Sequence, residues 1–400
     1  MENKKKSAYY FILLLGIVSL FSDLTHEGAR SILGPYLALL GASAAAIGFV
    51  SGLGEFIGYA LRIVTGFISD KTKKYWTMAI IGYGINIVAI PLLAFLPENG
   101  WVLACGLILA ERFGKAIRNP AKSTLVSFAA SKVGPGKGFA LQEALDQIGA
   151  FAGPVILFII LTLKGAGTEK EAYAKCFLAL GVTAILALAV LLAAKKIYPH
   201  PENFEPDAGD DKKISFNRSF WFYIAAISLV AAGFIDFPLI AFHLADKSIM
   251  PSNYIPLLYA FAMGVDAAAA LYFGWLYDKK GIKSLMAAVL ISAFFAPFIF
   301  LLNGKISIVI GMLLWGIGMG AQESILKATV TSLTGKNQRA TAFGIFNTGF
   351  GAFWFIGSWI MGYVYSFSLP VIVIISMAFQ LLSLPLLFKI RNEVKGQDGA

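Results

Sequence analysis

The chain has 400 residues, of which 58% are hydrophobic and 14% are charged, and its mean hydropathy is +0.73. A soluble globular protein carries about 25% charged residues, so this composition excludes a soluble domain and predicts an integral membrane protein. The net charge of +10 would suit a nucleic-acid partner. However, the basic residues gather in short loops on one side of the predicted membrane, which argues against such a partner.

A helix needs about 20 apolar residues to cross a bilayer, and apolar runs punctuated by Gly, Pro and charge predict twelve such helices. The first six cover residues 8–38, 44–69, 76–96, 101–123, 138–164 and 173–194. The last six cover residues 219–243, 254–277, 284–302, 306–330, 340–366 and 369–389. The polar stretch 195–218 predicts a cytoplasmic linker. We therefore expect an all-α membrane protein of two six-helix bundles, residues 1–194 and 219–400, the second ending in a short cytoplasmic tail.

The distribution of lysine and arginine predicts the orientation of these spans. Segments on one side of the predicted membrane hold 21 of these residues, and loops on the other side hold 5. Because cytoplasmic loops carry an excess of Lys and Arg, we expect both termini to be cytoplasmic. We also expect a multi-pass protein of the plasma (inner) membrane.

The first predicted span carries four ionisable residues, Asp23, His26, Glu27 and Arg30. At 100° per residue they lie within an arc of about 100°, on one face of the helix. A charge at the bilayer centre costs about 2.5–3.5 kcal/mol, so this face needs either a water-filled cavity or opposite charges. We interpret it as a substrate- or proton-handling face, and a purely structural ion-pair network is the alternative.

Three further spans carry charges that could pair with this face. The predicted coupling residues outside the first span are Glu55, Arg62, Arg112, Lys115, Arg118, Glu143 and Asp146. Asp23 and Glu27 are the expected partners of the bases on the fourth span, and Glu143 and Asp146 could also pair with them. In the second half, intramembrane acids outnumber bases, which weakly favours a cationic or polar neutral substrate.

An internal repeat supports the division into two halves. Gly66, Asp70 and Lys71 follow the second span in a G-x-x-x-D-K pattern, and Gly274, Asp278 and Lys279 repeat it 208 residues later. The two copies predict two like-oriented halves of six spans each.

Together with the twelve spans and the polar linker, these paired loop motifs resemble those of the major facilitator superfamily. The stretch from Arg112 to Lys122 is similar to that of a prokaryotic permease branch of the family. The resemblance implies a secondary transporter that moves a small molecule by alternating access. It also implies that the loop residues gate the transporter by latching its outward-open state. The first copy departs from the family pattern, because Lys73 stands where a glycine is usual.

The fifth span contains Gly149, Gly153 and Pro154 in a pattern that resembles the G-x-x-x-G-P core of the family's antiporter signature, without its trailing glycines. This resemblance favours proton-coupled efflux by antiport. A plain packing motif is the alternative for the glycines. Proton-coupled uptake of a small solute and a non-transporting membrane receptor on the same fold are the alternatives for the function.

Other classes of activity find little support. The chain has no G-x-x-x-x-G-K-(S/T) loop for ATP and no convergent nucleophile or metal set. We therefore expect no enzyme activity, no cofactor and no metal. Cys105 and Cys176 lie in or beside apolar stretches and do not suggest a disulfide. The expected partners are a small-molecule substrate, protons and lipid, and a monomer suffices because one chain holds both halves.

Overall fold

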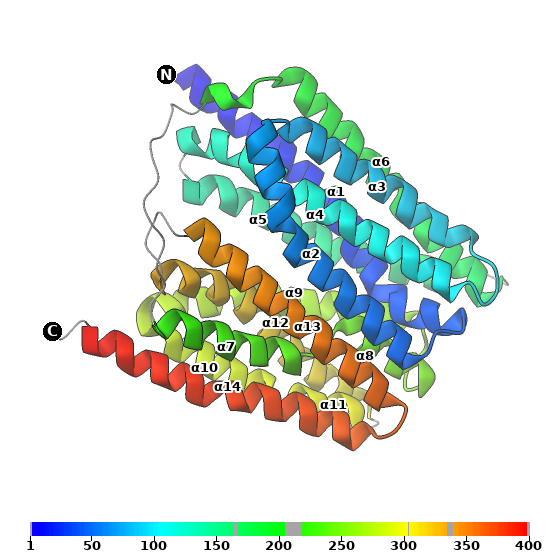
Figure 1. The fold of residues 1–400 in the computed structure, drawn as a ribbon. Helices are drawn as coiled ribbons and strands as arrows, with labels where there is room; N and C mark the ends of the chain where they lie inside the picture. Colours follow the sequence, from blue (N-terminus) through cyan, green and yellow to red (C-terminus); the bar gives the residue numbers. More distant parts are fainter. Residues whose placement is uncertain are drawn as a thin grey trace. The chain divides into compact units, whose positions relative to one another are not determined.

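The computed structural model describes residues 2–133, 135–163, 167–204, 218–302, 304–333 and 339–397 (Figure 1). All regular secondary structure in these residues is helical. They form two compact units, one from residues 1–41 and 61–210 and the other from residues 42–60 and 211–400. The linker expected at 195–218 is described as far as residue 204 and again from residue 218.

The first unit holds α1 and α3 to α6, together with the second part of α2. Its elements are α1 (Glu2–Leu39), α2 (Ala44–Thr72), α3 (Tyr75–Leu92), η1 (Leu93–Phe95), α4 (Trp101–Val133), α5 (Pro135–Thr162), α6 (Glu169–Ile197) and η2 (Pro201–Phe204). α1 packs against α4, α5 and α6. A buried apolar cluster of α1, α3, α4 and α6 includes Phe11, Leu15, Trp76, Leu125 and Leu191. These contacts surround α1 with helices, so its polar face lies inside the unit.

The second unit holds the remaining helices and the first part of α2. Its elements are α7 (Arg218–Gly233), α8 (Phe237–Asp246), α9 (Tyr254–Lys280), α10 (Ile282–Ser292), α11 (Phe295–Phe300), α12 (Lys305–Leu333), α13 (Arg339–Tyr365) and α14 (Leu369–Gln397). The closest packing joins α9 to α12 and α7 to α14. Residues 42–60 belong to this unit because glycines let α2 meet α13. A Cβ on Gly48 would lie 2.4 Å from the carbonyl oxygen of Ser358.

Two of the expected single spans are each broken into two helices. α7 and α8 occupy the seventh span, and α10 and α11 occupy the ninth. Pro238 and Pro297 lie just inside the second helix of each pair. Because proline has no backbone N–H, neither can continue the preceding helix through an i to i−4 hydrogen bond. The break after α7 is held by Ser376 and Trp315, which donate hydrogen bonds to the carbonyl oxygens of Gly233 and Ile235 at 2.6 and 2.9 Å.

Ten helical stretches of the described chain are long and apolar enough to cross a membrane. They correspond to ten of the twelve expected spans. The remaining two, α4 and α13, have compositions that lower their hydropathy: α4 carries Glu111 and four bases within twelve residues, and α13 is rich in glycine and aromatic residues. Large apolar side chains such as Leu271 and Ile306 are about 80% exposed. Exposed apolar surface of this kind suits contact with lipid.

Candidate functional site

The charged face expected on α1 lies against α4 inside the first unit. His26 and Arg30 of α1 and Glu111 and Arg112 of α4 are all buried. Most of the predicted coupling residues of these two helices therefore lie away from lipid, in the interior of the unit.

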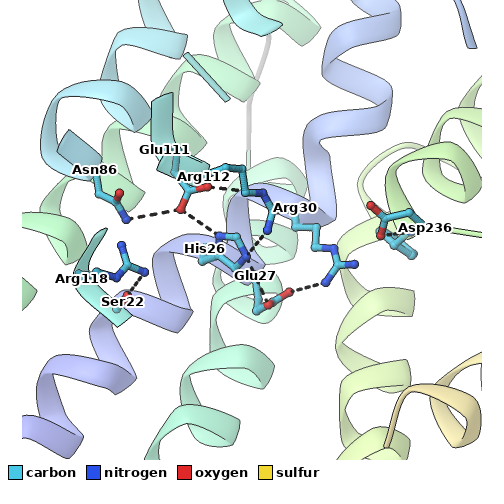
Figure 2. Close-up of polar contacts among 10 residues, drawn as sticks. Ser22, His26, Glu27, Arg30, Asn86, Glu111, Arg112, Arg118 and Asp236 are labelled. Atoms are coloured by element: carbon cyan, nitrogen blue, oxygen red, sulfur yellow. Dashed lines mark hydrogen bonds and ion pairs between the residues drawn. The ribbon is translucent and has the colours of Figure 1, made fainter. Parts of the chain in front are cut away.

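His26 is the centre of this network (Figure 2). Its Nδ1 lies 3.1 Å from Oε1 of Glu111, and its Nε2 lies 3.0 Å from Nη1 of Arg112. A guanidinium can only donate hydrogen bonds, so Nε2 accepts from Arg112 and Nδ1 donates its proton to Glu111. The imidazole is therefore neutral in this arrangement, and one tautomer is selected. Oε1 of Glu27 lies 3.7 Å from the same Nε2.

Two carboxylates share the bases around His26. Glu111 Oε2 lies 3.7 Å from Nε of Arg112, and Glu111 Oε1 accepts a 3.5 Å hydrogen bond from Nδ2 of Asn86. Oε2 of Glu27 lies 3.6 Å from Nη1 of Arg30. Figure 2 shows these contacts as one connected set that runs from α3 through α4 to α1. Glu111 faces three donors, His26, Asn86 and Arg112, whereas Glu27 pairs with Arg30 and lies beside the accepting Nε2 of His26.

A second group of charges joins α1, α4 and α5. Lys122 Nζ lies 4.0 Å from Oδ2 of Asp146 and donates a 2.5 Å hydrogen bond to Oγ of Ser19. Asp23 interacts electrostatically with Asp146, Lys115 and Lys122. The structure therefore brings Asp146 to a base of α4, as expected.

Arg118 differs from the other buried bases of α4. Its side chain is 1% exposed, and its Nη2 donates a 2.7 Å hydrogen bond to Oγ of Ser22. The guanidinium carbon lies 4.6 Å from the centre of the Tyr83 ring, in the range of a cation–π contact. Among the described side chains, no carboxylate lies within 4.0 Å of Arg118. The expected pairing of Arg118 with Asp23 or Glu27 is therefore absent from this arrangement.

The remaining predicted coupling residues lie elsewhere. Glu143 is exposed, and its pairing with a base of the fourth span stays a prediction. Glu55 and Arg62 are half-buried on α2, with Glu55 in the part assigned to the second unit and Arg62 in the part assigned to the first. Lys115 is half-buried on α4.

Sequence reasoning missed four uncharged members of the network: Ser19, Ser22, Tyr83 and Asn86. Ser19 and Ser22 are three residues apart on α1, as are Tyr83 and Asn86 on α3, so each pair shares a helix face. Polar residues with this spacing in an apolar span were the available signal. Tyr83 and Asn86 reach α4 because Gly82 and Gly114 let the two helices touch. A Cβ on Gly82 would lie 2.5 Å from the carbonyl oxygen of Gly114.

The glycines of the antiporter-like motif lie between α5 and α1. A Cβ on Gly149 would lie 2.3 Å from the carbonyl oxygen of Leu20, and one on Gly153 would lie 2.3 Å from that of Leu24. Real Cβ atoms do not approach a backbone oxygen this closely, so the two helices need glycine here. The geometry supports the close packing expected of the motif. The antiport assignment itself stays a prediction.

Each loop motif is followed by a residue with a positive φ angle. Lys73 has φ +56°, and Gly281, seven residues after Gly274 as Lys73 is after Gly66, has φ +58°. The lysine therefore takes the left-handed conformation that glycine favours. Lys71 and Lys279 are exposed, and Nζ of Lys279 lies 3.9 Å from the centre of the Trp275 ring. The side chains of Asp70 and Asp278 lie outside the described part of the structure, so the gating role stays a prediction.

Comparison with known proteins agrees with this architecture. The family model of the Major Facilitator Superfamily matches residues 15–358 and 255–399. An uncharacterised protein of Mycobacterium tuberculosis is 38% identical over 391 residues, which cover 96% of this chain and 94% of that protein. An uncharacterised MFS-type transporter of Methanocaldococcus jannaschii is 29% identical over 377 residues, 89% of each chain.

Solved structures show the same fold at low sequence identity. A mutant form of the nucleoside transporter NupG has a TM-score of 0.75 and 16% identity, covering 96% of this chain and 99% of that one. A bacterial homologue of the human lysosomal transporter Spinster, in an inward-facing and occupied conformation, has a TM-score of 0.72 and 14% identity, covering 96% of each chain.

The helices, their hydropathy and the buried charges define a multi-pass membrane protein of the transporter class. The chain belongs to the Major Facilitator Superfamily.

Proposed function

We propose that the chain exports a small molecule in exchange for protons, through a site that opens alternately to the two sides of the membrane. The observation that carries this proposal is the network centred on His26. Its five ionisable members are His26, Glu27, Arg30, Glu111 and Arg112. Ionisable groups inside a membrane are costly, and they commonly mark substrate or proton pathways.

The contacts of His26 and Glu27 support the proposed proton exchange. In the arrangement described, Nε2 of His26 holds a lone pair that accepts from Arg112. A proton that binds Nε2 displaces this donor, and the resulting imidazolium can pair with Glu27, 3.7 Å away. Alternatively, a proton on Glu27 neutralises the partner that Arg30 has at 3.6 Å. Either event frees an arginine to take another partner, which is how a charge network can select between two states.

The proposal that transport is outward depends on the motif of the fifth span. The similarity of Gly149, Gly153 and Pro154 to the antiporter signature favours export. A protein that carried protons and solute in the same direction would be an uptake system instead, and one that bound a ligand without flux would be a receptor.

The test uses the full chain reconstituted in liposomes with a pH-sensitive dye inside. Thermal unfolding against a panel of drugs, sugars, organic acids and amino acids first selects a ligand, because binding to the folded state raises the unfolding temperature. Adding that ligand on one side should then move protons toward the ligand. Proton movement with the ligand would indicate uptake, and ligand binding without any flux would contradict transport.

Glu27→Gln tests the coupling residue. We expect it to abolish ligand-driven proton movement while retaining ligand binding. Glu98→Gln is the matched control, because this substitution removes the same charge at an exposed position. Coupling that survives in Glu27→Gln would remove Glu27 from the mechanism. Asp23→Asn tests Asp23 in the same way. If transport by this variant depends on the pH gradient as it does in the unmodified chain, Asp23 takes no part in proton coupling.

A further inference from the structure

We infer that Arg118 and Lys122 of α4, with Ser19 and Ser22 of α1 and Tyr83 of α3, form a recognition site for an oxyanion, a carboxylate or phosphate group of the cargo. This inference rests on the proposed transport function, since it names a chemical class for the transported molecule. It differs from the cationic or neutral cargo that the acids of the second half favour.

The charge of Arg118 is the first observation that favours an anion at this site. The other buried bases of the first unit each have a carboxylate within 4.0 Å: Arg30 has Glu27, Arg112 has Glu111 and Lys122 has Asp146. Arg118 is the most deeply buried of them, and no described carboxylate lies within that distance. Glu111 interacts with Arg118 electrostatically without direct contact, and an anion in direct contact would reduce the cost of burying this charge, which is several kcal/mol for an unpaired ion. A bound water could satisfy its hydrogen bonds but not its charge, so the arrangement favours an anion.

The hydrogen-bonding groups around Arg118 are the second observation. Nη1 of Arg118 and the hydroxyl of Tyr83 are buried and have no hydrogen-bond partner among the described residues. Buried polar groups are nearly always paired, so each exception needs an explanation. Both groups can donate, and they lie together because the guanidinium stacks on the Tyr83 ring.

Ser19 and Ser22 add two hydroxyl donors to the site. Oγ of Ser22 accepts from Arg118, and Oγ of Ser19 accepts from Lys122. Each serine therefore keeps its own hydroxyl proton for donation. The two bases are one helical turn apart on α4, and the two serines face them from α1. A guanidinium fork with several hydroxyl donors matches the planar oxygens of a carboxylate and the oxygens of a phosphate.

Acidic groups near the site limit its position. Asp146 lies 4.0 Å from Lys122, beyond hydrogen-bond distance, and Asp23 interacts with Lys122 electrostatically. Asp23 also interacts with Lys115, and Glu111 interacts with Arg118. Of the two bases of the site, Lys122 has a described carboxylate within 4.0 Å and Arg118 does not, so the oxyanion should contact mainly Arg118, Ser22 and Tyr83.

The test measures thermal unfolding of the purified full chain in detergent, with phosphate, sulfate, acetate or succinate at constant ionic strength. We expect at least one anion to raise the unfolding temperature saturably, by about 2 °C or more. Phosphate or sulfate alone would indicate a phosphate-type cargo, and acetate or succinate alone a carboxylate. A rise that does not saturate and is equal in all variants is a general salt effect and contradicts the site, as does no rise with any of the four.

Four variants locate the effect. Arg118→Gln should weaken the apparent affinity by about ten-fold or more, as loss of a charged hydrogen bond predicts. Tyr83→Phe keeps the ring contact and should weaken it less. Lys175→Gln removes one exposed positive charge of α6 and should bind as the unmodified chain does. If Arg118→Gln does not fold, Arg118→Lys replaces it and should weaken binding while keeping the charge.

Unchanged affinity in the Arg118 variants would overturn the inference. Binding is measured without transport, so the two proposals can fail separately. Loss of anion binding with transport intact would leave only this inference wrong. Intact binding without flux would leave only the transport proposal wrong.

Discussion

At the scale of single residues, the first unit contains few charges that act alone. Glu111 accepts from His26 and Asn86 and pairs with Arg112. It is therefore the carboxylate that holds α1, α3 and α4 together by polar contacts. It also selects the tautomer of His26, which leaves Nε2 as the nitrogen that can gain a proton.

Glu111→Gln should lower the stability of the folded protein by about 3 kcal/mol, because removing one partner leaves buried charge uncompensated. Thermal or chemical unfolding in detergent measures this loss. Glu98→Gln, at an exposed position, should change stability by less than about 0.5 kcal/mol. Equal stability of the two variants would show that Glu111 does not stabilise the unit.

At the scale of elements, glycine and proline decide how the helices end and meet. The motif glycines of α5 admit the backbone of α1, and Pro238 and Pro297 accompany the breaks in two spans of the second unit. The turn after each loop motif shows a difference between the halves. Gly281 takes its positive φ without strain, whereas Lys73 takes the same φ with a side chain.

Lys73→Gly should therefore stabilise the protein, by about 0.5 kcal/mol, since relief of the left-handed strain exceeds the extra backbone entropy of glycine. Gly281→Ala is the reciprocal variant. A Cβ there meets no atom within 4 Å, so its expected loss of about 1 kcal/mol comes from the backbone conformation alone. Unfolding temperatures of the two variants should move in opposite directions. A lower unfolding temperature for Lys73→Gly would contradict this explanation of the turn.

At the scale of the whole molecule, the chain is a multi-pass membrane protein, and its basic loops predict its orientation. The excess of Lys and Arg on one predicted side, 21 against 5, predicts cytoplasmic termini. The same rule places the loop at residues 97–100 outside.

Reporter fusions measure this topology directly. A green fluorescent protein fused after Ala400 should fluoresce, because it folds in the cytoplasm, and alkaline phosphatase fused there should be inactive. Alkaline phosphatase fused after Glu98 should be active. Active phosphatase at the C-terminus would reverse the orientation, and equal activity at both sites would contradict the expected number of spans between them.

The sequence by itself determined the membrane class, the helical spans and the family, all of which are confirmed. These follow from composition, run length and repeated motifs, which are local properties. Helical periodicity also showed that Asp23, His26, Glu27 and Arg30 share a face. It could not show what faces them, because contacts between helices depend on how the spans pack.

Only the tertiary structure decided that His26 contacts Glu111 and Arg112, that Asp146 lies near Lys122, and that Glu143 is exposed. The structure also brought Tyr83 to Arg118, through the close contact of α3 and α4 that Gly82 and Gly114 allow, and Ser22 to Arg118 from α1. These residues come from segments tens of residues apart. Their meeting depends on side-chain volume and backbone approach across several helices, which no single segment contains.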